Sequence, residues 1–133
     1  MQRFLDFFEK RKLGVAVSIP YEGKYFTVTK AELTIPDESA KSDFIYHDMP
    51  EFVAEGVARR SLDKHDKERA GQVSGGRAIK ALYLKVKHFE DKALLGIQKN
   101  KHGMTDSQYT EALTALEKRY RRLVQGHIHL LMG

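Results

Sequence analysis

The feature that most constrains this fold is a pair of long apolar stripes in the C-terminal half, separated by one short break. Apolar residues recur at spacings of three and four between Arg77 and Asn100, and again between Tyr109 and Val124. The interruption, Lys101-His102-Gly103, is long enough for a turn and little more. Helical periodicity on both sides of a short loop predicts an antiparallel helical hairpin over residues 77–126.

The start and the end of the second predicted helix are both marked in the sequence. Thr105 and Gln108 have the spacing of a capping box, in which the threonine hydroxyl and the glutamine amide satisfy each other's backbone N–H groups. Gly126 is a natural helix stop. We therefore expect residues 127–133 to form a tail or an edge strand.

The first half predicts a small antiparallel sheet behind a short helix. Aromatic residues at helical spacing predict a helix over residues 3–12, and alternation predicts strands over residues 13–19 and 25–35, joined by a turn at 21–24. The alternation changes phase in the second strand, so we expect a bulge near Thr29-Lys30. A third strand is predicted at residues 43–47.

A middle helix and a linker are expected next. Pro50 and Glu51 are typical of a first helical turn, which predicts a helix from Pro50 to about Leu62. Residues 63–76 are charged and then glycine-containing, so we interpret them as a linker or a frayed helix end, in which Ser74-Gly75-Gly76 forms a helix cap and a joint. The 133 residues thus suit one α+β domain, with a sheet-containing half (1–62), a linker (63–76), a helical hairpin (77–126) and a tail (127–133).

Charge is divided unevenly along the chain, whose net charge is +5. Residues 1–75 hold 12 Lys and Arg against 13 Asp and Glu, a net −1, whereas residues 76–133 hold 11 against 5, a net +6. A basic helical surface is the electrostatic footprint of phosphate-backbone binding. The leading hypothesis is accordingly a non-enzymatic protein that contacts nucleic acid non-specifically. The expected contacts are Lys80, Lys85, Lys87, Lys99, Lys101, Lys118, Arg119, Arg121 and Arg122.

Protein–protein interaction is the alternative function. Residues 31–55 carry seven acidic residues against one base, Lys41, so the chain offers an acidic and a basic surface. An inhibitor, an adaptor or a structural subunit, such as a phage or plasmid accessory protein, fits this description, and the basic face then meets an acidic protein. The apolar stripes also allow a homodimer in which two hairpins form a four-helix bundle.

A third hypothesis follows from Gly126-His127-Ile128-His129. On a strand, His127 and His129 would point the same way and could hold one divalent metal. The pair resembles that of the HUH nucleases, which cut single-stranded DNA with a tyrosine. The resemblance covers about five residues and implies a metal-dependent nuclease in which Tyr109 or Tyr120 is the nucleophile.

Other classes of function lack a sequence pattern. The chain has no cysteine, so disulfides and thiolate metal sites are excluded. It has no nucleotide-binding fingerprint, and we predict no cofactor. No apolar run reaches the roughly 20 residues that cross a bilayer, and residues 1–12 do not have the pattern of a signal peptide. We therefore expect a cytoplasmic protein without a membrane partner.

Overall fold

The α+β class predicted from the sequence is confirmed. A computed structural model describes residues 2–34, 49–59 and 67–132. Its elements are, in chain order, α1 (Gln2–Lys10), β1 (Gly14–Glu22), β2 (Phe26–Thr34), β3 (Val53–Arg59), α3 (Lys67–His102) and α4 (Asp106–Met132). The three strands form one antiparallel sheet in the order β1-β2-β3.

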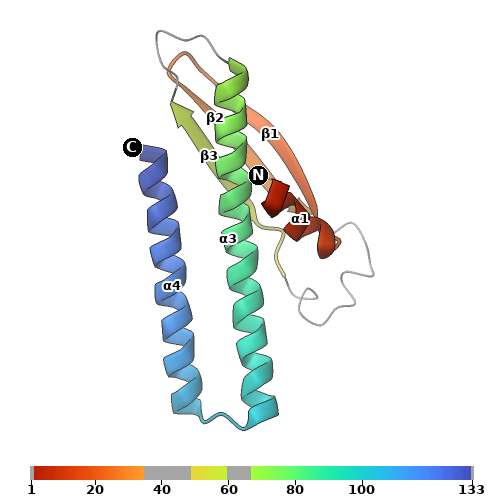
Figure 1. Cartoon of the computed structure of the whole chain (residues 1–133), viewed down its shortest axis with the longest axis vertical. Coiled ribbons are helices and arrows are strands. Elements are labelled where there is room, and N and C mark those ends of the chain that lie inside the picture. Colours follow the sequence, from red (N-terminus) through yellow and green to blue (C-terminus); the bar gives the residue numbers. More distant parts are fainter. Residues whose placement is uncertain (1, 35–48, 60–66, 133) are drawn as a thin grey trace.

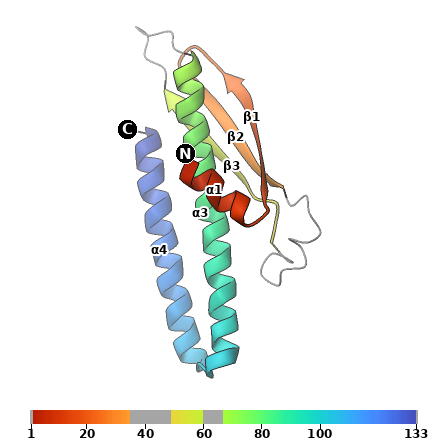
Figure 2. The ribbon, with the colours of Figure 1, turned by 45° about the vertical axis from the view of Figure 1, so that its right-hand side comes forward.

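Two helices cover one face of the sheet, and the third packs beside them. α3 crosses β2 and β3, and α1 lies next to it against β1 (Figure 1). α4 runs back along α3, so that the lower half of the hairpin extends beyond the sheet in both views (Figure 2). In the described part of the chain, no helix is both long and apolar enough to cross a membrane.

The predicted bulge is present, but on the other strand of the pair. Ser18 pairs with Lys30 and Tyr21 with Val28, so Ile19 and Pro20 of β1 together face Thr29. The predicted phase change within β2 is wrong, because Thr27, Thr29, Ala31 and Leu33 are all buried. The threonines are polar, and the apolar pattern therefore misidentified this face.

The middle helix predicted from Pro50 to Leu62 is wrong where the structure describes it, because residues 53–59 form β3. The buried residues of this strand are Ala54, Gly56 and Ala58, which alternate with exposed or half-buried neighbours. Small residues suit a face that a helix approaches closely, but they give little apolar periodicity. The predicted third strand at residues 43–47 lies outside the described residues.

Gly56 shows how closely α3 approaches the sheet. A β-carbon at this position would lie 2.1 Å from the Ser74 carbonyl oxygen and 2.3 Å from the Ala78 nitrogen. The linker predicted over residues 63–76 is therefore wrong from residue 67 onward, because Ser74-Gly75-Gly76 lies inside α3. These small residues let the helix backbone pack on β3, instead of ending or capping the helix.

The main core lies between α1, the sheet and α3. Phe8, Leu33, Leu82 and Val86 are among its fully buried side chains. Beside this core, the Arg11 guanidinium forms an ion pair with Glu90 of α3.

The helical hairpin is confirmed and is longer than predicted. Thr105 Oγ1 accepts from the Gln108 N–H at 3.1 Å, and Gln108 Oε1 accepts from the Thr105 N–H at 3.0 Å, as the capping box predicts. Gly103 in the connecting loop has a φ of 63°, a conformation that favours glycine. The tail or edge strand predicted for residues 127–133 is wrong over 127–132, because α4 continues to Met132.

Candidate functional site

α4 presents most of its surface to solvent. Within residues 106–126 no side chain is fully buried, since α4 packs along one stripe on α3. Tyr109, Leu116 and Tyr120 belong to this half-buried stripe, and the opposite side of the helix is exposed. The hairpin therefore displays one long free helix face to any partner.

The cations predicted from the run Lys118-Arg119-Tyr120-Arg121-Arg122 lie on different sides of this helix. Lys118, Arg121 and Arg122 are exposed around the side that faces away from α3, and we call these three residues the outer face of α4. Arg119 is also exposed but lines a groove between α3 and α4. None of the four forms an ion pair with a carboxylate among the described residues.

Three of the predicted α3 lysines are engaged within the chain. Lys85 Nζ donates to the Val53 carbonyl oxygen at 2.5 Å, and Lys87 Nζ lies 3.2 Å from Asp91 Oδ1. Lys99 Nζ lies 2.7 Å from Asp106 Oδ1 and 4.8 Å from the Tyr109 ring centroid. Lys85 therefore holds α3 to β3, Lys87 is paired within α3, and Lys99 joins α3 to α4 across the loop.

The two remaining predicted lysines lie far from each other. Lys80 is half-buried in the part of α3 that crosses the sheet, whereas Lys101 is exposed in the last turn beside the loop. Along a straight helix, 21 residues span about 31 Å, so Lys80 and Lys101 belong to opposite ends of the surface. The nine predicted residues therefore do not form one compact patch.

A groove that the sequence did not reveal lies on one flank of the hairpin, with a volume of about 530 Å³. We call it the aromatic groove. Phe52 at the entry to β3, Phe89 of α3 and Tyr120 of α4 contribute its rings. Its full lining is Phe52, Lys85, His88, Phe89, Lys92, Ala93 and Tyr120. The sequence could not reveal it because Phe52 lies within the predicted helix from Pro50 to Leu62, and residues 53–59 of that range form β3 instead.

Glu117 organises the polar edge of the aromatic groove. Its Oε1 lies 3.1 Å from Lys92 Nζ and 3.3 Å from His88 Nε2, and the His88 ring stacks on Tyr120 with centroids 4.2 Å apart. The hydrogen bond from Lys92 lowers the pKa of Glu117, and the nearby His88 also lowers it. Burial raises the pKa of Tyr120, with a further contribution from the Glu117 charge.

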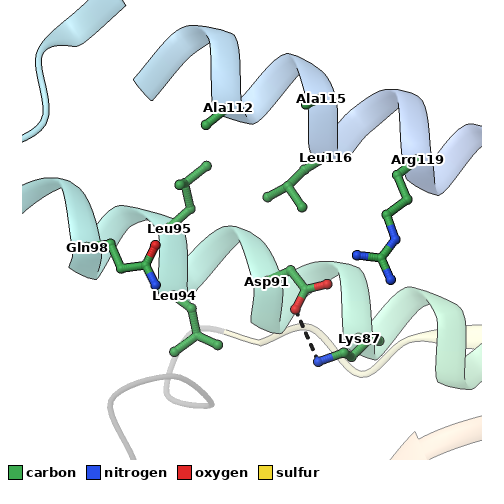
Figure 3. Close-up of a pocket in the computed structure, with 9 residues that line it drawn as sticks. All are labelled: Lys87, Asp91, Leu94, Leu95, Gln98, Ala112, Ala115, Leu116 and Arg119. Carbon is green, nitrogen blue, oxygen red and sulfur yellow. Dashed lines mark ion pairs between the residues drawn. The ribbon is translucent and has the colours of Figure 1, made fainter. Parts of the chain in front are cut away.

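A second groove, of about 620 Å³, lies between α3 and α4 and shares no lining residue with the aromatic groove (Figure 3). α3 contributes Asp91, Leu94 and Leu95 to its lining, and α4 contributes Ala112 and Ala115. The small alanines of α4 therefore lie across the groove from the larger side chains of α3. Leu94 keeps 42% of its surface exposed there. We call this the alanine groove, and Arg119 lies at its end nearer the sheet.

The strand required for the histidine-pair hypothesis does not form. His127 and His129 are both in α4, so the metal site that a strand geometry would create has no basis. In the described part of the chain, no group of three or more histidine, aspartate or glutamate side chains is placed to hold a metal ion.

Comparison with known proteins gives no relative. A scan against protein-family models, a search of curated proteins and a search of solved structures each found no match.

Proposed function

We propose that the outer face of α4 binds the phosphate backbone of nucleic acid without reading base sequence. The observation that carries this proposal is the contrast between two sets of cations. Lys85, Lys87 and Lys99 are engaged by groups of the same chain. The outer face, by contrast, holds three exposed cations without an ion-pair partner among the described residues.

The spacing of these cations suits a polyanion. Lys118 and Arg122 are four residues apart and therefore lie on one side of the helix, with Arg121 beside them. Arginine and lysine contact phosphate oxygens through charge-assisted hydrogen bonds. Because such contacts release condensed counterions, affinity should fall steeply with salt.

The test is the salt dependence of binding by the triple variant Lys118→Ala/Arg121→Ala/Arg122→Ala. Fluorescence anisotropy with a labelled DNA duplex should show about tenfold weaker binding at low salt, and each lost contact should reduce the slope of log K against log salt by about 0.9.

The matched control removes the same charge elsewhere. Arg3, Lys10 and Lys24 are exposed cations in the first half of the chain. Their replacement by alanine should leave the slope nearly unchanged. Equal losses in both triple variants would contradict the proposal, because they would show that net charge acts instead of a site.

A second candidate function is self-association through the alanine groove. Leu94 of this groove is 42% exposed, and Ala112 and Ala115 leave room for a side chain. The groove also carries both Asp91 and Arg119, so a second copy would meet complementary charges. Light scattering should then report twice the monomer mass, and Leu94→Glu should return the mass to that of a monomer. A monomer mass for the unmodified protein at high concentration would reject this function.

A further inference from the structure

The lining of the aromatic groove combines aromatic rings with lysine side chains. Its rings come from Phe52, Phe89 and Tyr120, and the Phe52 and Phe89 centroids lie 6.1 Å apart with the rings 68° from parallel. A volume of about 530 Å³ lies within the range of small-molecule sites, and the lining is mainly apolar. The groove is thus wide enough for a planar group to contact an aromatic ring.

Two lysines stand in the same lining. Lys85 Nζ donates to the Val53 carbonyl oxygen, and Lys92 Nζ lies 3.1 Å from Glu117. An ammonium group has three donors, and each of these lysines uses one in the contact that holds it. Lys85 is held on the Val53 carbonyl oxygen, whereas the more exposed Lys92 keeps donors for an anion that enters the groove.

The groove adjoins the outer face of α4 along the chain, because Tyr120 lines the groove and directly precedes Arg121. Arg121 follows Tyr120 directly and lies one turn beyond Glu117 on the same flank of the helix. A strand whose phosphates contact Arg121 could therefore place a neighbouring base against the rings. Cationic tracks with aromatic side chains beside them are the usual means of holding single-stranded nucleic acid.

We propose that the aromatic groove is a subsite for one unpaired nucleobase, with Lys92 at its edge beside the phosphate, so that the protein prefers single-stranded to double-stranded nucleic acid. This inference rests on the proposed function, since the backbone contacts on α4 bring the strand to the groove. Bases within a duplex are stacked and paired, and they would not enter the groove.

The test compares Phe89→Leu with Tyr25→Leu on two probes, labelled oligo(dT) and a labelled duplex of equal length. Phe89→Leu keeps much of the apolar volume while removing the ring, so binding of oligo(dT) should weaken about tenfold and binding of the duplex should change little. Tyr25, 59% exposed in the β1–β2 turn, is a matched control whose change to leucine should affect neither probe. Unchanged oligo(dT) binding by Phe89→Leu would overturn the inference.

Three further measurements separate the possible failures. Circular dichroism shows whether Phe89→Leu folds. If it does not, Lys92→Gln is the second test, because loss of this lysine should also weaken binding of oligo(dT). Thymidine monophosphate should compete only weakly, and displacement of oligo(dT) at micromolar concentrations would overturn the inference in favour of a free-nucleotide site. If the triple variant of the outer face binds both probes like the unmodified protein, the proposed function fails. If only Phe89→Leu leaves binding of oligo(dT) unchanged, the base subsite alone is rejected.

Discussion

Thr29 Oγ1 of β2 and Ser74 Oγ of α3 lie 2.6 Å apart in the interface between the sheet and the long helix. Both residues are almost completely buried, at 1% and 0% exposure. Ser74 uses its own hydroxyl hydrogen on the Gly71 carbonyl oxygen, so Thr29 donates to Ser74. The closest contact between helix and sheet therefore includes a satisfied polar pair.

Removing one hydroxyl group of this pair should lower the free energy of unfolding more than removing both. Ser74→Ala leaves the buried Thr29 hydroxyl without its acceptor and should lower the free energy of unfolding by about 2 kcal/mol. Adding Thr29→Val should recover part of that loss, with a coupling of about 1 kcal/mol. Urea denaturation of the two single variants and the double variant measures this coupling. Strict additivity would show that the hydroxyl groups act independently.

Gly56 should not tolerate even a methyl group. A β-carbon there meets two backbone groups of α3 at 2.1 and 2.3 Å, and backbone cannot move aside cheaply. Gly56→Ala should therefore destabilise the fold by about 3 kcal/mol. Gly96→Ala is the control, because its β-carbon has nothing within 4 Å and alanine favours a helix by about 1 kcal/mol. Thermal unfolding should move in opposite directions for the two variants, and a neutral Gly56→Ala would contradict this packing.

Replacement of Lys12 by glycine should stabilise the fold. Its φ of 57° is left-handed, and the Leu13 and Lys12 N–H groups donate to the Phe8 and Glu9 carbonyl oxygens in the helix-ending pattern that glycine favours. Lys12→Gly should raise the free energy of unfolding by about 1 kcal/mol. Lys12→Ala removes the same charge but keeps the β-carbon, and it should give no such gain. Equal effects of the two changes would assign the gain to charge.

The sequence predicted the elements whose apolar residues are large. The hairpin followed from two leucine-rich stripes and the Thr105–Gln108 capping box, and both hydrogen bonds of that box are present. Interfaces formed by small or polar side chains were not predicted. β3 buries Ala54, Gly56 and Ala58, and α3 begins at Lys67, inside the predicted linker. Close backbone packing uses small residues and therefore leaves no apolar periodicity.

The sequence predicted which basic residues the candidate site contains, but not how their side chains are arranged. Composition identified the basic half of the chain, yet it could not show that Lys99 pairs with Asp106 across the loop or that Arg119 turns into a groove. Those contacts depend on which helix faces meet. The aromatic groove could not be predicted without β3, because Phe52, directly before that strand, packs against Phe89 of α3.

Glu117 makes the hairpin sensitive to acid. Hydrogen bonding to Lys92 lowers the pKa of Glu117 below its ordinary 4.5, so its stabilising effect is complete above pH 4.5 and is lost as the pH falls through the lowered value. The difference in urea midpoint between the unmodified protein and Glu117→Gln should shrink as the pH falls from 7 to 3. Glu111→Gln changes an exposed carboxylate on the same helix and serves as the control. A difference that stays constant with pH would contradict the role of Glu117.

The most direct test of the central claim is the affinity of the unmodified protein for a DNA duplex over a salt series. With three phosphates contacted by Lys118, Arg121 and Arg122, log K should fall linearly with log salt at a slope of about −3. No binding at low salt, or binding that does not change with salt, would contradict the proposal that the outer face of α4 holds a nucleic-acid backbone.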